Sequence, residues 1–115
     1  MPYIVINTVR ELDLEKKEKI KAALGRLMSI IPTKAEANLL IDFSGGHTFY
    51  KGGVQVEGAY IDLKLYGKSD FEPKKQYTAE VFSLLSQELG LTKEYMYLTI
   101  QEYETWGSNG ELKTK

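Results

Sequence analysis

Residues 33–41 read TKAEANLLI, and residues 92–100 read TKEYMYLTI, with four identities in nine positions. The second copy begins 59 residues after the first, which is close to half of the 115-residue chain. Each copy ends in an apolar run of the length and composition typical of a β-strand. The match therefore predicts an internal repeat within one domain, with units of about residues 1–57 and 58–115.

The first unit is predicted to contain a strand, an amphipathic helix and a second strand. Tyr3–Ile6 is a β-branched and aromatic run of strand length. From Leu14 to Ile31 the apolar residues recur at threes and fours until Pro32 ends the pattern, and Asp13 stands where an N-cap is expected. The run at 39–43 supplies the second strand, and the glycine-rich segment 45–53 is predicted to be a loop.

The second unit repeats this order. A strand is predicted at Tyr60–Leu63, and Pro73 lies near the first turn of the helix that follows. Gly90 stands just past the end of that helix, and residues 96–100 form the last long strand. The core stripe of this helix is predicted to be Tyr77, Val81, Leu84, Leu85 and Leu89.

Two such units predict an α+β fold. Right-handed crossovers place both helices on one face of a single four-stranded sheet. Strand residues on both faces look apolar, namely Tyr3, Val5, Leu39, Ile41, Tyr60, Leu98 and Ile100. The uncovered face and the strand edges then favour self-association in a closed ring, and the alternative is a monomer with a partly apolar sheet face.

Composition narrows the classes of function. The chain is 43% hydrophobic and 27% charged, as in globular proteins, and it has no Cys, which excludes thiol catalysis and disulfides. The fifteen Lys and Arg residues are nearly balanced by sixteen Asp and Glu residues. This absence of excess positive charge argues against nucleic acid or an anionic membrane as a partner. With no membrane-length apolar run and no basic-then-apolar leader, we expect a cytoplasmic protein, and secretion without a signal peptide stays open.

Few residues suit catalysis. His47 is the single histidine and is most simply a surface residue, so we expect no metal and no cofactor. Neither Gly pair of the glycine-rich segment has phosphate-loop spacing. Pro2 is the unusual residue, because removal of Met1 would leave a secondary amine as the N-terminus. Burial beside a cation would lower the pKa of that amine below its usual value of about 8 and make it a usable base. The alternative is a rigid residue that opens a strand.

A combination of features resembles a known family over essentially the whole chain. It comprises Met1-Pro2, the strand ending Asn7-Thr8, Lys34, Gly52-Gly53, Gly58-Ala59 to Gly67-Lys68, Tyr97-Leu98-Thr99 and Trp106. Together they are similar to macrophage migration inhibitory factor and its D-dopachrome tautomerase relatives. The resemblance implies the tautomerase fold, a homotrimer with sites at its interfaces, and keto-enol tautomerisation of phenylpyruvate-type 2-keto acids.

The resemblance also implies roles for individual residues. Pro2 would be the general base, and Lys34 would bind the substrate carboxylate and lower the pKa of the amine. The backbone amide of Tyr66 would contact substrate, and Tyr97 of a neighbouring subunit would close the pocket around the aromatic ring. The remaining substrate-binding candidates are Tyr3, Asn38, Thr99 and Trp106. From the residues alone, the favoured interpretation of Lys34 is an exposed lysine in a helix-to-strand turn, like Lys93. The alternative for Tyr3 and Tyr97 is packing within the sheet, and the alternative for Trp106 is a packed C-terminal anchor.

The sequence departs from the family at several positions. The CxxC pair of the vertebrate cytokine falls on Gly58 and Ile61, so thiol oxidoreductase activity has no residues here. The pocket Asn of the family falls on Thr99, an aromatic wall residue falls on Asn38, and the tail after Trp106 diverges. Two other functions stay open, a cytokine-like signalling or host-interaction protein and a ligand-binding or structural trimer with a relict pocket.

Overall fold

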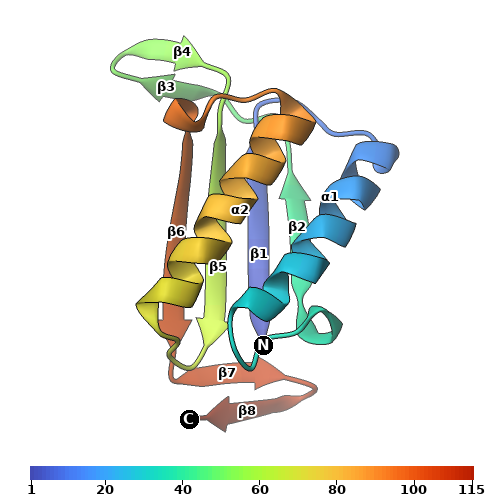
Figure 1. The fold of residues 1–115 in the computed structure, drawn as a ribbon, viewed down its shortest axis with the longest axis vertical. Helices are drawn as coiled ribbons and strands as arrows, with labels where there is room; N and C mark the ends of the chain where they lie inside the picture. Colours follow the sequence, from blue (N-terminus) through green and yellow to red (C-terminus); the bar gives the residue numbers. More distant parts are fainter.

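The computed structural model describes residues 1–115 and contains two β-α-β units that share one sheet (Figure 1). The strands and helices, in chain order, are β1 (Pro2–Thr8), α1 (Leu14–Leu27), β2 (Leu40–Ser44), β3 (Phe49–Lys51), β4 (Val54–Val56), β5 (Ala59–Tyr66), α2 (Phe71–Leu89), β6 (Met96–Tyr103), β7 (Thr105–Ser108) and β8 (Glu111–Thr114). Three short 3₁₀ helices are η1 (Met28–Ile30), η2 (Glu36–Asn38) and η3 (Lys93–Tyr95).

The main sheet has the order β2-β1-β5-β6. β1 and β2 are parallel, β5 and β6 are parallel, and the two central strands β1 and β5 are antiparallel. Both helices cover the same face of this sheet (Figure 1). The predicted α+β fold with four main strands and two helices on one face is therefore confirmed, while the division near residue 57 stays a prediction.

The helix ends follow local sequence signals. The Asp13 side chain accepts a hydrogen bond of 2.8 Å from the backbone N–H of Lys16, as an N-cap does. Gly90 ends α2 with φ of +68°, a conformation that glycine adopts without a steric penalty. The prediction that the first helix continues to Ile31 is wrong, because the α-helix ends at Leu27 and tightens into η1. Neither helix is long and apolar enough to cross a membrane.

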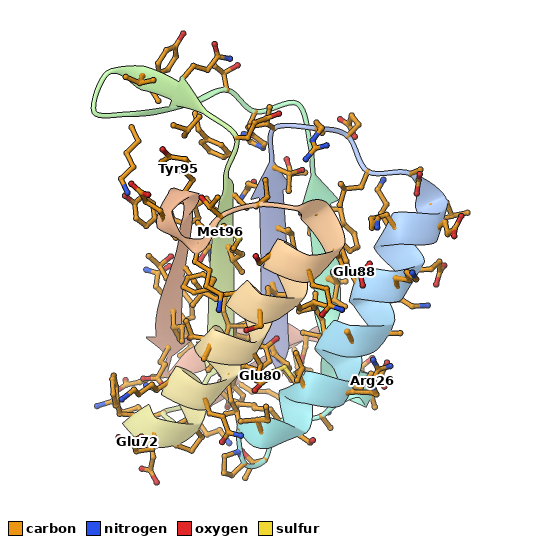
Figure 2. The ribbon with its side chains drawn as sticks, turned by 45° about the horizontal axis from the view of Figure 1, so that its top comes forward. Arg26, Glu72, Glu80, Glu88, Tyr95 and Met96 are labelled. Carbon is orange, nitrogen blue, oxygen red and sulfur yellow. The ribbon has the colours of Figure 1, made fainter.

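The core lies between the helices and the sheet, where side chains fill the space (Figure 2). Alternate residues of the central strands, among them Ile4, Ile6, Ile61 and Leu63, are completely buried there. They meet a helical stripe in which Ile20, Leu24, Tyr77, Val81 and Leu85 are also completely buried. Burial of each such side chain stabilises the fold by about 1.5–3 kcal/mol before the entropy of folding is subtracted.

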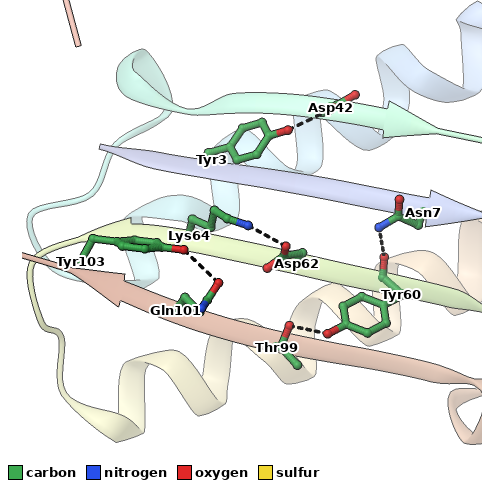
Figure 3. A network of polar contacts seen from close by, with 9 residues as sticks. All are labelled: Tyr3, Asn7, Asp42, Tyr60, Asp62, Lys64, Thr99, Gln101 and Tyr103. Atoms are coloured by element: carbon green, nitrogen blue, oxygen red, sulfur yellow. Dashed lines mark hydrogen bonds and ion pairs between the residues drawn. The ribbon is translucent and has the colours of Figure 1, made fainter. Parts of the chain in front are cut away.

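The open face of the sheet differs from the prediction. Leu39, Ile41, Leu98 and Ile100 pack against the core, so the expectation of apolar side chains on both faces is wrong for these four residues. The other face carries tyrosines and a network of polar contacts (Figure 3). Its hydrogen bonds and ion pair join Tyr3 to Asp42 at 2.9 Å, Tyr60 to Thr99 at 2.8 Å and Lys64 to Asp62 at 2.8 Å. The period of two along each strand therefore separates the core face from a face of mixed polarity, on which Val5 alternates with the buried Ile4 and Ile6.

Two short hairpins lie outside the main sheet, and the first stands where the sequence predicted a loop. The glycine-rich segment contains β3 and β4, which turn at Gly52 and Gly53 with φ of +60° and +79°. The tail after Trp106 belongs to β7 and β8, which turn at Asn109 and Gly110 with φ of +52° and +81°. Two successive residues with positive φ are what a two-residue hairpin turn requires, and Asn-Gly and Gly-Gly supply them.

Candidate active site

One end of the sheet brings together the N-terminus, the turn before η2 and the β7–β8 hairpin (Figure 1). A hollow of about 550 Å³ opens at this end. Its lining consists of Thr33, Lys34, Tyr66, Gly67, Lys68, Glu102, Tyr103, Glu104 and Lys115. Basic, acidic and aromatic side chains from four separate parts of the chain therefore meet around one space large enough for a small molecule.

The backbone N–H and carbonyl of Tyr66 connect the parts of this site. Its N–H donates a hydrogen bond of 3.3 Å to the Met1 carbonyl, and its carbonyl accepts one of 2.8 Å from Lys34 Nζ. Pro2 is buried and is bonded through its nitrogen to that same Met1 carbonyl carbon. The Pro2 nitrogen, the Tyr66 amide and the Lys34 ammonium consequently lie around one point of the molecule.

Lys34 is a buried lysine without an acidic partner. Its side chain is only 8% exposed, and its one hydrogen bond goes to a neutral carbonyl. Burial lowers the pKa of Lys34 and the nearby Lys115 lowers it further, while Glu102 opposes the shift. A carboxylate bound beside Lys34 would restore the missing counter-charge, so this position is suited to an anionic ligand.

The amino terminus shares this environment. Burial lowers the pKa of the Met1 amino group, and the cations Lys34, Lys115 and Lys113 lower it further. The Met1 sulfur also accepts a hydrogen bond of 3.0 Å from the Ser108 hydroxyl on β7. An amine at this end of the chain therefore loses its proton more readily than an ordinary N-terminus.

Tyr66 and Tyr103 form an aromatic wall of the hollow, and Trp106 packs beside both. The Trp106 ring lies 6.4 Å from the Tyr66 ring and 6.1 Å from the Tyr103 ring, measured between centroids. Lys115 Nζ lies 4.9 Å from the Tyr66 ring centroid, on the same side of the site. Such rings offer apolar contact to an aromatic ligand next to a cluster of cations.

No protein-family model matches this chain, and no curated protein matches it. Solved structures do match. MIF2 of Leishmania major superposes with a TM-score of 0.91 at 22% identity, over 98% of this chain and 97% of the other. The chain has the fold of the macrophage migration inhibitory factor proteins.

Two further structures extend this likeness within the tautomerase fold. A fused 4-OT asymmetric trimer matches with a TM-score of 0.80 at 15% identity, over 95% of this chain and 94% of the other. Pt0534 inactivated by 2-oxo-3-pentynoate matches with a TM-score of 0.77 at 14% identity, over 94% of this chain and 93% of the other. The resemblance to macrophage migration inhibitory factor is therefore confirmed for the fold.

Within this tautomerase fold, one chain gathers four of the expected site residues and separates the others. Pro2, Lys34, Tyr66 and Trp106 lie at the same end of the sheet, linked as described above. Asn38 is exposed in η2, and Tyr3 and Thr99 point to the open face, where they bond to Asp42 and Tyr60. Of all the expected site residues, only Lys34 and Tyr66 line the hollow of their own chain.

Tyr97 lies near the other end of the sheet. Pro2 pairs with Leu65 of β5 and Tyr97 pairs with Tyr60, so the two are separated by five residues along β5, or about 17 Å. Lys51 Nζ lies 5.2 Å from the Tyr97 ring centroid, beside the β3–β4 hairpin. Tyr97 can therefore approach a Pro2 only in another copy of the chain.

The single histidine also lies away from the hollow. His47 is half-buried, its Nε2 is 2.9 Å from Ser44 Oγ, and its ring stacks on Phe49. Ser44 pairs with Asn7, at the opposite end of β1 from Pro2. His47 thus orders the loop between β2 and β3.

Sequence reasoning missed several contributors to the site, of which three stand out. Thr33 lines the hollow, Lys115 lies over Tyr66, and Ser108 bonds to Met1. Asn109-Gly110 is a strong hairpin signal that could have predicted the fold of the tail and hence the positions of Ser108 and Lys115. The sequence carries no comparable signal for Thr33.

Proposed function

We propose that this chain is a keto-enol tautomerase of phenylpyruvate-type 2-keto acids, in which the amine of Pro2, released by removal of Met1, is the general base. The observation that carries the proposal is the backbone of Tyr66, whose N–H donates to the Met1 carbonyl and whose carbonyl accepts from the buried Lys34. The nitrogen proposed as base and the cation proposed to bind the carboxylate are thus both linked to the backbone of one residue.

Removal of Met1 would have two effects at this point. It would convert the Pro2 nitrogen from an amide into a secondary amine with a basic lone pair. It would also free the Tyr66 N–H, whose hydrogen bond now goes to the Met1 carbonyl. A substrate carboxylate would then accept hydrogen bonds from Lys34 and from Tyr66, which are charge-assisted and therefore strong.

The reaction follows from these positions. In ketonisation, the Pro2 amine takes the hydroxyl proton of the enol, the C2–O bond becomes a carbonyl, and C3 receives a proton from the Pro2 ammonium. Negative charge builds on the substrate oxygen as the proton leaves, and the cations around the site stabilise it. Enolisation of the keto acid follows the same steps in reverse, so one base serves both directions.

The comparisons support the substrate class. Pt0534, which has this fold, is inactivated by 2-oxo-3-pentynoate, itself a 2-oxo acid. The aromatic wall of Tyr66, Tyr103 and Trp106 favours a substrate whose C3 carries a ring. An aromatic 2-keto acid would place its carboxylate beside the buried cation and its ring against this aromatic wall.

The proposal is tested with protein shown by intact mass to begin at Pro2. We expect this protein to accelerate the loss of enol-phenylpyruvate absorbance well above the rate in buffer, which must be subtracted because the enol also ketonises unaided. A rate equal to that in buffer, from protein whose thermal unfolding is cooperative, would contradict the proposed activity.

We also propose that the protein is a homotrimer. The 4-OT structure of the same fold is a trimer, and Tyr97 reaches a Pro2 only across a subunit boundary. Sedimentation equilibrium at micromolar concentration should give three times the mass of the chain.

Tyr97→Ala should raise KM by a larger factor than it lowers kcat, because it removes part of the pocket wall. A stable monomer that is fully active would contradict both the trimer and the role of Tyr97.

A further inference from the structure

The turn that leads into Lys34 has an unusual backbone. The Lys34 N–H donates to the Ile31 carbonyl at 3.1 Å, Pro32 takes the second position, and Thr33 takes the third with φ of +67°. These are the features of a type II β-turn, whose third position normally holds glycine or asparagine. A β-branched side chain there is crowded by its own backbone, so Thr33 is strained.

The second Thr-Lys pair of the sequence shows that this conformation is not intrinsic to the two residues. Thr92 has φ of −83°, and the Lys93 that follows it is exposed, with Nζ 3.5 Å from Ser83 Oγ. Lys34, which follows the left-handed Thr33, is instead buried against Tyr66. The positive φ therefore accompanies the inward direction of the lysine.

Glycine would allow the same turn without strain, so the turn alone does not account for a threonine. Thr33 lines the same hollow as Lys34 and is an exposed residue, so its hydroxyl is not enclosed by the rest of the protein. We propose that Thr33 is a substrate-binding residue whose hydroxyl donates a hydrogen bond to the substrate carboxylate beside Lys34. This inference rests on the proposed function, because it assumes that the hollow takes a 2-keto acid.

The chemistry of the carboxylate fits a third donor. Two carboxylate oxygens offer about four lone-pair sites, of which Lys34 and the Tyr66 N–H would occupy two. A hydroxyl on the rim of the same hollow can supply one more. Strained backbone conformations in proteins are commonly found at binding sites, and the position of Thr33 on this hollow agrees with that.

The test uses a probe that cannot enolise, so that binding is measured apart from turnover. 3-Phenylpropanoate has the carbon skeleton of phenylpyruvate without the carbonyl, and its Kd is measured by calorimetry on protein that begins at Pro2. We expect Thr33→Val and Thr33→Gly to weaken binding about tenfold, the usual effect of losing a hydrogen bond to a charged group. Thr33→Ser, which keeps the hydroxyl, should bind within about twofold of wild type.

Thermal unfolding tests the strain separately. Thr33→Gly should raise Tm by about 3 °C, because glycine adopts positive φ freely. The matched control Thr92→Gly, at an ordinary φ, should lower Tm and leave Kd unchanged. A Thr33→Gly protein that loses stability as the control does would contradict the strain argument, and Thr33→Val binding at the wild-type Kd would overturn the hydroxyl contact.

Ketonisation rates on the same preparations separate this inference from the proposed function. Binding that depends on the Thr33 hydroxyl, in protein with no tautomerase activity, would leave the inference standing and contradict the proposed function. Normal turnover with KM and Kd unchanged in all Thr33 variants would overturn the inference alone. Wild-type protein that does not bind the probe would also overturn it.

Discussion

Protein that keeps Met1 should ketonise enol-phenylpyruvate at least about 100-fold more slowly than protein that begins at Pro2, which is the usual contribution of a general base. With Met1 in place the Pro2 nitrogen is an amide, and the Met1 carbonyl occupies the Tyr66 N–H at 3.3 Å. The base and one carboxylate donor are then lost together. Intact mass sorts the two forms, and their rates are compared at equal trimer content, established by sedimentation, so that folding and assembly are held fixed.

Pro2→Ala is the companion variant for this comparison. After removal of Met1 it still has an amine, but a primary one that is differently basic and less rigidly aimed, so it should lose most of the rate and yet exceed the Met1-retaining protein. The Tyr66 N–H is free of the Met1 carbonyl in this variant. Its rate therefore reports the loss of the proline ring separately from the effect of Met1 occupying the Tyr66 N–H. Equal rates for processed and Met1-retaining wild type would show that the proton goes to another group.

The fold was predictable from sequence where local and long-range signals agree. The strand runs, the apolar periodicity of both helices, the Asp13 N-cap and Gly90 each fix an element by its own residues. The sequence contains the alternation of inward-facing and outward-facing strand residues. The apolar character of the open face was nevertheless overestimated, because Leu39 and Ile41 were grouped with residues that face outward. Asp42 between inward-facing apolar residues is the signal that assigns the faces.

The site was less predictable than the fold. Tyr66 acts through its backbone N–H and carbonyl, and its partners Met1 and Lys34 are distant in sequence, so no pattern of side chains reveals these contacts and only the family resemblance pointed to the Tyr66 amide. Lys34 and Lys93 follow the same residue in matched repeats, yet only Lys34 is buried. The two positions also differ in the φ of the preceding threonine, which is +67° at Thr33 and −83° at Thr92.

Those two lysines provide the most discriminating pair of substitutions. Lys34→Ala should raise KM for enol-phenylpyruvate about tenfold or more, because it removes a charge-assisted partner of the carboxylate. Lys93→Ala removes the same side chain from the matched exposed position and should leave KM and kcat unchanged. Thermal unfolding of both variants checks that the fold is intact.

The pH dependence of kcat/KM tests the second role of Lys34. The base works when its amine is unprotonated, and the Lys34 cation lowers the pKa of the amino terminus after burial has lowered it. Without that cation the amine pKa rises, so a higher pH is needed to free the base. The acid limb of the Lys34→Ala profile should therefore move to higher pH, whereas that of Lys93→Ala should coincide with wild type. An acid limb that stays in place while KM rises would show that Lys34 binds the carboxylate without tuning the base.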